Sequence, residues 1–397
     1  MSLTQASQTY FPIYSEFVEL TEKHEKAHWG TWEVSLKDDV MQWQTGQIPE
    51  KTKAFIKTIL RIFTEGDRVV GADYYDHLIP VFKNNEVRNM LGSFAAREGT
   101  HQRAYALLND TLGFGKDFYT EFLEYKEMKD KIEFMSDLKH DSHRNTALSI
   151  GKQCFIEGVS LFASFAMLLN FGRQGLLPGM TDVNLWSVKD ESGHVEGNSL
   201  LFRKFLEEHP RIVNDEFKRE LYQTARDCVE LEDRFIDLTF DTGAVEGITR
   251  EEVKQYIRAV ADFRSVQLGL KPQYNVENPF PWLDWLVSST GMENFFEVNT
   301  TNYSKGSMTG EYSSGYDSYK SKPKEVIVWS KNNCQYCVNA KNLLKSKGFD
   351  FEERNVEVGN WTREQFFESN PSAKTFPQVW VDGKLIGGFT ELQKHLA

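Results

Sequence analysis

Two Glu-x-x-His pairs constrain this chain more than any other feature of its sequence. The first pair is Glu98 and His101, and the second is Glu191 and His194, 93 residues later. A Glu at position i and a His at i+3 lie on one face of a helix, about one turn apart, so each pair can offer a carboxylate oxygen and an imidazole nitrogen to one metal ion. Apolar residues at helical spacing precede both pairs, which indicates that both are buried.

Each pair also has a carboxylate upstream at a similar distance. Asp67 precedes Glu98 by 31 residues, and Glu157 precedes Glu191 by 34. A buried unpaired carboxylate is costly, and a metal ion relieves that cost. Four carboxylates and two histidines therefore predict a dinuclear metal site, built as in ferritin-like bundles, where two helices give one carboxylate each and two others give Glu-x-x-His. Two nearby acidic residues compete with Asp67 as the ligand from the first helix: Glu65 and Asp73.

Charge and composition exclude several classes of protein. The 397 residues carry a formal net charge of −12, which argues against nucleic-acid binding because that needs a concentrated basic face. No apolar run approaches the length of a membrane span, and the polar N-terminus lacks a secretory layout, so we expect a cytoplasmic protein without a membrane partner. Four cysteines in so long a chain are no disulfide framework. Cys154 and Cys228 are isolated and are expected to be small core residues.

Periodicity divides the chain into three parts: 1–300, 301–323 and 324–397. From Pro49 to about Leu270, apolar residues recur at three- and four-residue steps in the tracts 50–66, 86–110, 145–171, 183–208 and 213–239. Breaks fall at 172–179 and 241–247. We therefore predict a mainly α ferritin-like helical bundle. Residues 301–323 are rich in Ser, Gly and Tyr with almost no aliphatic residue, which predicts a flexible tail or linker.

The C-terminal part begins again with a strand at 325–329 and continues as β-α-β-α-β-β-α, which resembles the thioredoxin fold and predicts a small α/β domain. Cys334 and Cys337 form a Cys-x-x-Cys at the start of its first helix. Free N–H groups at a helix start stabilise a thiolate, so Cys334 is expected to attack and Cys337 to resolve the mixed disulfide. A zinc knuckle is the alternative, but the sequence offers no second Cys or His pair to complete four ligands.

Further motifs make residues 324–397 resemble a glutaredoxin. They are Lys331, three residues before Cys334, the Thr375-Phe376-Pro377 turn and the Gly387-Gly388-Phe-Thr-Glu segment. In that family the Pro of the turn is cis. The resemblance implies glutathione as the reductant and a glutathione site formed by Lys331, Tyr336, Phe376, Pro377, Gly388 and Thr390. Gln335 stands where glutaredoxins usually have Pro.

Tyr105 lies seven residues after Glu98, on the same helix face as the metal ligands. Two interpretations are open: its phenol is oxidised to a radical there, or the residue is an ordinary core aromatic. With its surroundings it completes a pattern over roughly residues 10–320. The pattern consists of Asp67-Arg-Val-Val-Gly, Arg-Glu98-Gly-Thr-His101-Gln-Arg-Ala-Tyr105, Glu157-Gly-Val-Ser-Leu-Phe and Lys-Asp190-Glu191-Ser-Gly-His194. It closely resembles the radical-generating small subunit of class I ribonucleotide reductase.

That resemblance assigns roles residue by residue. It implies that Asp67, Glu98 and His101 bind one metal ion and that Glu157, Glu191 and His194 bind the other, with iron expected and manganese also accepted by such ligands. Tyr105 would hold a stable radical. Trp29, with Trp32 as its rival, and Asp190 would relay electrons through a ligand histidine. A redox-active tyrosine in the tail would pass the radical on, and the candidates are Tyr303, Tyr312, Tyr316 and Tyr319.

The sequence thus predicts an oxidoreductase, a ribonucleoside-diphosphate reductase small subunit with glutaredoxin activity. The implied partners are a catalytic large subunit and a second copy of the chain. The tethered dithiol would re-reduce the disulfide that each turnover leaves in the large subunit, at an effective concentration that can be millimolar. The alternatives are another ferritin-like diiron oxidase fused to a glutaredoxin, and a bundle that is only a scaffold. The phosphorylation level of the substrate is a property of the large subunit.

Overall fold

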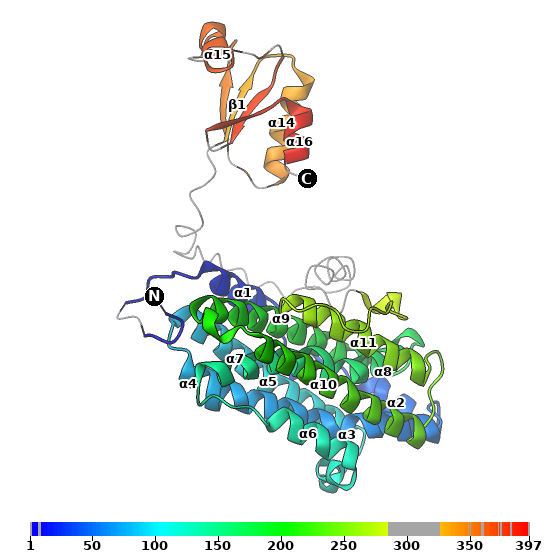
Figure 1. Ribbon diagram of the computed structural model, residues 1–397. Coiled ribbons are helices and arrows are strands. Elements are labelled where there is room, and N and C mark those ends of the chain that lie inside the picture. Colours follow the sequence, from blue (N-terminus) through cyan, green and yellow to red (C-terminus); the bar gives the residue numbers. More distant parts are fainter. Residues whose placement is uncertain are drawn as a thin grey trace. The chain divides into compact units, whose positions relative to one another are not determined.

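The computed structural model describes residues 2–6, 9–284, 326–347, 349, 351–358, 361–371, 373, 375–381 and 383–395. The chain divides into two compact units, residues 1–303 and 304–397 (Figure 1). The predicted flexible segment 301–323 lies outside the described residues, and so do its four candidate tyrosines: Tyr303, Tyr312, Tyr316 and Tyr319.

The N-terminal unit is a bundle of long helices (Figure 1). Its helices are α1 (Ser15–Lys26), α2 (Lys37–Gln44), α3 (Glu50–Asp73), α4 (Ile79–Val81), α5 (Asn85–Thr111), α6 (Lys126–Ser136), α7 (His143–Phe155), α8 (Phe162–Arg173), α9 (Pro178–Glu208), α10 (Asp215–Thr242) and α11 (Arg250–Gln267). Two π turns join them, η2 (Tyr74–Leu78) and η5 (Ile156–Ser160). Short 3-10 turns are η1 (Thr31–Glu33), η3 (Lys116–Tyr119), η4 (Glu121–Glu124), η6 (Pro210–Ile212) and η7 (Pro281–Leu283).

Side-chain caps and prolines fix where the long helices begin. Asn84 and Ser142 accept hydrogen bonds from backbone N–H groups in the first turns of α5 and α7, as residues of this type do at helix starts. Pro178 is the first residue of α9, where its missing N–H costs nothing. The buried Asp39 of α2 accepts hydrogen bonds from the N–H groups of Gly179 and Met180, both at 2.8 Å. The start of α9, which carries the second Glu-x-x-His, is thereby anchored to α2.

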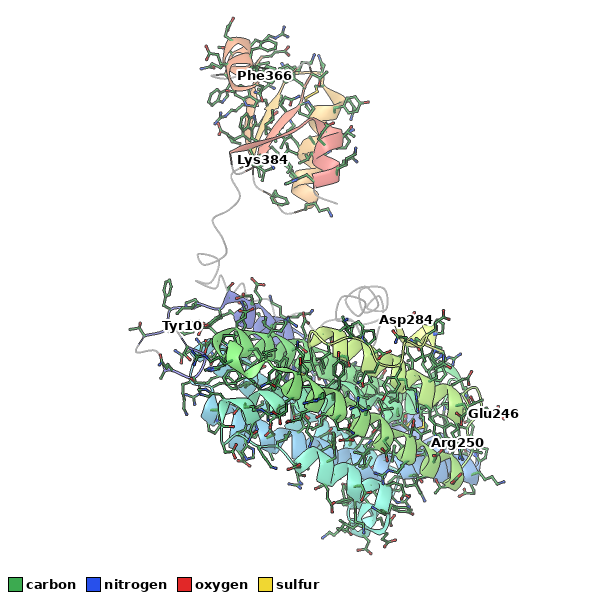
Figure 2. All side chains as sticks on the ribbon, in the orientation of Figure 1. Tyr10, Glu246, Arg250, Asp284, Phe366 and Lys384 are labelled. Atoms are coloured by element: carbon green, nitrogen blue, oxygen red, sulfur yellow. A yellow bond between two sulfur atoms is a disulfide. The ribbon has the colours of Figure 1, made fainter. Side chains whose placement is uncertain are left out.

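The breaks between helices lie close to the positions that the sequence predicts. Helix α8 ends at Arg173 and α10 ends at Thr242, next to the predicted breaks at 172–179 and 241–247. The turn between α10 and α11, marked by Glu246 and Arg250 in Figure 2, is tied to α8 because Asn170 donates to the Glu246 carbonyl at 2.7 Å. The expectation of a mainly α bundle followed by a small α/β unit is confirmed.

The predicted helical tract 145–171 is interrupted by η5. A π turn inserts an extra residue into the helix and leaves backbone carbonyls without their usual partners, and such turns often mark functional sites. The buried Lys131 of α6 donates to the Ser160 carbonyl at 2.6 Å and pairs with the Glu232 carboxylate of α10 at 2.5 Å. Arg264 of α11 donates to the Gly158 carbonyl at 3.3 Å. Two cations from neighbouring helices therefore hold the turn.

One tract corrects the expectation that no apolar run approaches the length of a membrane span. Residues His143–Arg173 are long and apolar enough to cross a membrane by length and composition. Their most apolar window is entirely buried inside the bundle, which is the setting of a core helix. The polar side chains that interrupt it at η5, Glu157 and Ser160, are buried as well.

The C-terminal unit contains β1 (Val326–Ser330), α14 (Gln335–Ser346), β2 (Glu352–Asn355), α15 (Arg363–Ser369), β3 (Gln378–Val381), β4 (Lys384–Gly387) and α16 (Phe389–His395). In the described part of this unit the strands form one sheet in the order β2-β1-β3-β4, with β1 parallel to β2 and antiparallel to β3. Strand residues alternate between the two faces. Val326 and Val328 pack toward α14 and α16, whereas Trp329 packs against Phe366 of α15.

Replacing Lys131 by Met should destabilise the helical unit. The change leaves the buried Glu232 without its partner, and breaking such a pair should cost about 3 kcal/mol of unfolding free energy. This is the lower end of the usual range. Burial raises the pKa of Glu232 to about 7, so the carboxyl can take up a proton and lose its charge. Urea unfolding followed by circular dichroism measures the loss. The matched control is Lys129→Met, an exposed lysine of the same helix, which should shift stability by less than about 0.5 kcal/mol. Equal stability of the two variants would contradict the role given to Lys131.

Candidate metal centre and dithiol site

The bundle brings the six predicted ligand side chains together in its core. They come from α3 (Asp67), α5 (Glu98 and His101), η5 (Glu157) and α9 (Glu191 and His194), and each is at most 1% exposed. They form two overlapping groups whose ligand-type atoms lie within 4.8 Å of one another: Asp67, Glu98, His101 and Glu191, and Glu98, Glu157, Glu191 and His194. Glu98 and Glu191 belong to both groups, so each could contribute a carboxylate to either of two candidate metal sites.

Close packing of helices around the cluster depends on a glycine. A Cβ atom at Gly197 of α9 would lie 2.7 Å from the Phe94 ring of α5 and 2.9 Å from the Met90 sulfur. A larger residue there would have to displace the Phe94 and Met90 side chains of α5. This close approach of α9 to α5 sets the two Glu-x-x-His pairs face to face.

The residues present fit a pair of metal ions. Both histidines direct Nδ1 toward the carboxylates: His194 Nδ1 lies 3.0 Å from Glu98 Oε1, and His101 Nδ1 lies 3.2 Å from Glu191 Oε1. In the described part of the chain, several buried atoms that face this centre have no hydrogen-bond partner of good geometry: Asp67 Oδ2, Glu98 Oε1 and Oε2, Glu191 Oε2, His101 Nδ1 and His194 Nδ1. Orphaned oxygens and nitrogens that converge on one point are what cation ligation would satisfy.

Burial and mutual charge perturb these groups strongly when no cation is present. Burial raises the pKa of Asp67 and raises that of Glu157 to about 8. Burial also acts to raise the pKa of Glu98, but the charges and hydrogen bonds of His101 and His194 outweigh it and bring the pKa to about 2. The protein therefore concentrates acidic groups that cannot all ionise together without bound positive charge.

The imidazole nitrogen of His101 that points away from the ligand carboxylates, Nε2, contacts the residues of the predicted electron relay. His101 Nε2 lies 3.1 Å from Asp190 Oδ2, and the Trp29 indole N–H donates to the same oxygen at 2.7 Å. Arg97 donates to the other Asp190 oxygen at 2.5 Å. Burial acts to raise the pKa of Asp190, but the hydrogen bond from His101 and the charge of Arg97 hold it well below its usual range. Trp29 is 5% exposed, whereas its rival Trp32 is 77% exposed, so the structure places Trp29 on this chain of hydrogen bonds.

The outer nitrogen of His194 has a partner that the sequence reading missed. His194 Nε2 lies 3.2 Å from Nε2 of the buried His24, whose Nδ1 lies 2.8 Å from Ser93 Oγ. Burial, then the nearby His194, lowers the pKa of His24 to about 3, so its ring is neutral. If His194 gives Nδ1 to a metal, its proton is on Nε2, and His24 must accept it and donate from Nδ1 to Ser93. The pair on α1 and α9 is separated by 170 residues, so no local spacing points to it.

Glu157 also has unpredicted partners. The Tyr74 hydroxyl donates to Glu157 Oε1 at 2.5 Å, Asn198 donates to Oε2 at 2.8 Å, and Gln153 donates to Oε1 at 3.2 Å. Tyr74 and Glu157 both sit in π turns. The extra residue in each turn changes which side chains face inward, and apolar periodicity carries little signal for such a change.

Tyr105 is fully buried on the same helix as Glu98 and His101. Its hydroxyl donates to Asn184 Oδ1 at 3.2 Å, and its ring stacks on Phe63 at 4.3 Å. Burial, with the negative charge of Asp67, raises its pKa, so the phenol keeps its proton.

The rivals of Asp67 lie elsewhere. Glu65 pairs with Arg68 at 2.5 Å, and the Asp73 carboxylate contacts His77 and His140 instead of the six-residue cluster.

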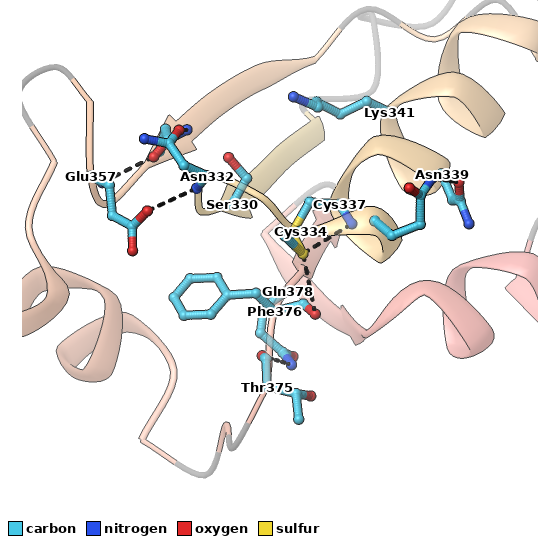
Figure 3. The surroundings of a disulfide bond; sticks show 12 residues. Ser330, Asn332, Cys334, Cys337, Asn339, Lys341, Glu357, Thr375, Phe376 and Gln378 are labelled. Atoms are coloured by element: carbon cyan, nitrogen blue, oxygen red, sulfur yellow. Dashed lines mark hydrogen bonds between the residues drawn. A yellow bond between two sulfur atoms is a disulfide. The ribbon is translucent and has the colours of Figure 1, made fainter.

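The dithiol site is the start of α14 (Figure 3). Cys334 and Cys337 form a disulfide, and the Cys337 backbone N–H donates to Cys334 Sγ at 3.2 Å. Cys334 is partly exposed, whereas Cys337 is 1% exposed. The peptide bond between Phe376 and Pro377 is cis, and the Phe376 carbonyl oxygen lies 3.9 Å from Cys334 Sγ. An exposed attacking sulfur and a buried resolving sulfur are the arrangement that thiol exchange needs.

The predicted glutathione residues differ in exposure. Tyr336 is 63% exposed and lies beside Phe389, with ring centroids 6.3 Å apart. The Gly388 N–H donates to the Glu391 carboxylate at 3.0 Å. Lys331 and Thr390 are exposed, Phe376 is partly exposed and Pro377 is buried. Gln335 donates to Asn339 at 3.0 Å, a contact one helical turn along α14.

Comparisons with known proteins agree with both resemblances. Residues 7–279 match the family model of the ribonucleotide reductase small chain, and residues 326–386 match that of glutaredoxin. A protein of Invertebrate iridescent virus 3, described as a probable ribonucleoside-diphosphate reductase small subunit, is 39% identical over 73% of this chain and 82% of its own length.

Solved structures share the fold. The ribonucleotide reductase R2 subunit from Clostridium botulinum superposes with a TM-score of 0.64 at 20% identity, over 69% of this chain and 89% of that one. The ribonucleotide reductase Rnr4 homodimer from Saccharomyces cerevisiae gives a TM-score of 0.61 at 19% identity, over 74% and 92%. The chain thus belongs to the ribonucleotide reductase small-chain family of oxidoreductases and carries a C-terminal glutaredoxin domain.

Proposed function

We propose that the helical unit generates a tyrosyl radical beside a dinuclear metal site and passes it to a catalytic large subunit that reduces ribonucleotides. The observation that carries this proposal is the buried six-residue cluster, connected through His101 and Asp190 to Trp29. A ferritin-like store needs neither that hydrogen-bonded chain nor Tyr105 beside its ligands. Membership of the small-chain family favours the same function over another diiron oxidase or a scaffold.

Asp67, Glu98 and His101 would hold one ion, and Glu157, Glu191 and His194 the other. Carboxylates and imidazoles accept both iron and manganese, and we propose iron. Bound iron, with dioxygen as the oxidant, supplies one-electron oxidation at this position. Tyr105 would lose one electron and its phenolic proton, both taken up by the oxidant. Before oxidation its hydroxyl donates to Asn184 Oδ1, and its ring stacks on Phe63.

Trp29 and Asp190 would carry an electron between the cluster and the large subunit, because hydrogen bonds join Trp29, Asp190 and His101 without a gap. The viral relative, named for ribonucleoside diphosphates, supports a diphosphate substrate. The yeast relative that was solved as a homodimer supports a second copy of this chain as a partner. A cytoplasmic location stays a prediction.

The glutaredoxin domain would be the reductant. In the reduced form, Cys334 thiolate would attack the large-subunit disulfide, and Cys337 would then displace the large-subunit thiol. The large subunit gains two electrons and two protons, and Cys334 and Cys337 become the disulfide. Two glutathione molecules would restore the dithiol and leave as glutathione disulfide.

Replacing His24 by Ala should weaken metal binding. His194 loses the acceptor of its Nε2–H and the partner that orients its ring, and loss of such a partner typically costs about 10- to 100-fold in metal affinity. Competition with a chelator measures the affinity in the full chain. His28→Ala, an exposed histidine one turn later, is the matched control and should bind like the wild type. Unchanged affinity in His24→Ala would show that His24 does not position His194.

Replacing Tyr105 by Phe should keep both metal ions but abolish the tyrosyl signal and nucleotide reduction. Electron paramagnetic resonance after reconstitution with iron and oxygen measures the radical, and metal analysis confirms loading. Tyr256→Phe is the matched control, because Tyr256 is also buried and its hydroxyl has no hydrogen-bond partner among the described residues. A tyrosyl signal that survives in Tyr105→Phe would place the radical elsewhere.

Replacing Cys334 by Ser should abolish turnover that depends on glutathione while leaving the Tyr105 radical intact. The assay is ribonucleotide reduction by the holoenzyme with glutathione, glutathione reductase and NADPH as the only electron supply. Cys337→Ser should still reduce glutathione mixed disulfides, which need one thiol, but should fail with a protein disulfide. Cys154→Ala, which removes a buried thiol, should behave as the wild type. Full activity of Cys334→Ser would leave the domain without the reductant role.

A further inference from the structure

A second cluster of ligand-type side chains lies where α3 ends, outside the six-residue cluster. Asp73 is the last residue of α3, His77 belongs to the π turn η2, and His140 lies between α6 and α7. One ligand-type atom from each lies within 4.8 Å of the other two. We propose that these three side chains form a mononuclear site for a divalent transition-metal ion, with Zn²⁺ as the ion bound.

The geometry of the three groups suits one small cation. His77 Nδ1 and His140 Nε2 each lie 3.1 Å from Asp73 Oδ1. Ligands about 2.1 Å from a tetrahedral zinc ion stand about 3.4 Å from one another, so each of these two distances is within a few tenths of an ångström of the one that the ion requires. The two imidazole rings are stacked, with centroids 5.1 Å apart and planes within 9°. Both rings thus direct one nitrogen at the same carboxylate oxygen from the same side.

Burial and charge favour a bound ion over a triad held by hydrogen bonds alone. The side chains of Asp73 and His140 are 4% and 5% exposed, whereas that of His77 is 49% exposed. The site is closed on two sides and open at His77, which leaves a route for an ion and a position for a water ligand. A triad held by hydrogen bonds uses Asp73 Oδ1 twice, and in the described part of the chain Asp73 Oδ2 has no hydrogen-bond partner. A cation held by the three side chains would compensate the charge of this buried carboxylate.

The ligand types select the class of metal. Two imidazoles with one carboxylate suit Zn²⁺ and its neighbours in the first transition row, whereas Mg²⁺ and Ca²⁺ prefer sets of oxygen ligands. Bound there, the ion ties the end of α3 to the segment before α7. The residue after Asp73 is Tyr74, whose hydroxyl donates to Glu157. The ion would therefore hold the turn that presents Tyr74 to the six-residue cluster. Metal binding by Asp73, His77 and His140 does not depend on the function proposed for the six-residue cluster.

The test counts metal ions in the full-length chain. Metal-free protein is saturated with Zn²⁺ alone, passed through a desalting column and analysed, and a parallel titration with Co²⁺ alone follows the visible absorption of the bound ion. The wild type should hold one ion more than His77→Ala and His140→Ala. The affinity of that site for Co²⁺ should fall by more than about 100-fold in both variants. Loss of a residue that only hydrogen-bonds to a metal ligand costs about 10- to 100-fold, so a larger loss identifies a direct ligand. The ions of the six-residue cluster stay in every variant, so failure of the proposed radical function cannot imitate this result.

Two controls make the outcome decisive. His143→Ala removes an exposed ring that packs on His209 at 4.0 Å, and Asp76→Asn removes an exposed carboxylate of η2; both should match the wild type. Because His77 is half exposed, the metal-free His77→Ala protein should melt at the wild-type temperature. The same ion count and Co²⁺ affinity in the wild type, His77→Ala and His140→Ala would show a hydrogen-bonded triad only. Loss of the ion in the controls as well would equally overturn the proposal.

Discussion

Negative charge concentrated in an apolar helical core is the constraint on which the N-terminal unit depends. Four carboxylates and two imidazoles that are at most 1% exposed cannot be stabilised by water. Burial raises the pKa of Asp67 and of Glu157, whereas the two histidines lower that of Glu98. Positive charge must enter the cluster, and the surrounding helices must hold its ligands in one geometry. Glycine at 197, the cap that Asp39 provides for α9, and the cations at η5 all serve that requirement. A bundle that relaxed at any of these points would move a ligand.

Helical periodicity predicted much of this arrangement because the ligands obey it. Glu98, His101 and Tyr105 share one face of α5, and Glu191 and His194 share one face of α9, so an i, i+3 spacing is enough to bring them together. The start of a helix likewise distinguishes the two cysteines, since Cys334 caps α14 and is partly exposed, whereas Cys337, one turn later, faces the core. Alternation along β1 likewise predicts its two packed faces. Local spacing carries information when the chemistry lies within one element.

What the sequence could not supply are the contacts between distant elements and the irregular turns. The hydrogen bond between His24 and His194 spans 170 residues, and that between Trp29 and Asp190 spans 161, which only the resemblance to a known family suggested. The π turn η5 interrupts a tract that reads as one continuous apolar helix. Its residues and those of α8 are buried on nearly every side, so no polar face shows the change of phase that an inserted residue causes. The ion pair of Lys131 with Glu232 is equally hidden, since each residue alone looks like part of a solvated helix face.

A glutaredoxin domain fused to the helical unit places a redox-active cysteine pair in the same chain as two other thiols. Cys154 and Cys228 are fully buried, and burial raises the pKa of each thiol to about 12. At pH 7 only about one such thiol in 10⁵ is ionised, and the thiolate is the species that attacks a disulfide. Cys334, in contrast, is partly exposed at a helix start, where a backbone N–H contacts its sulfur. Cys154 and Cys228 therefore stay protonated and do not attack the oxidised Cys334–Cys337 pair, which leaves that disulfide to thiols from outside the chain.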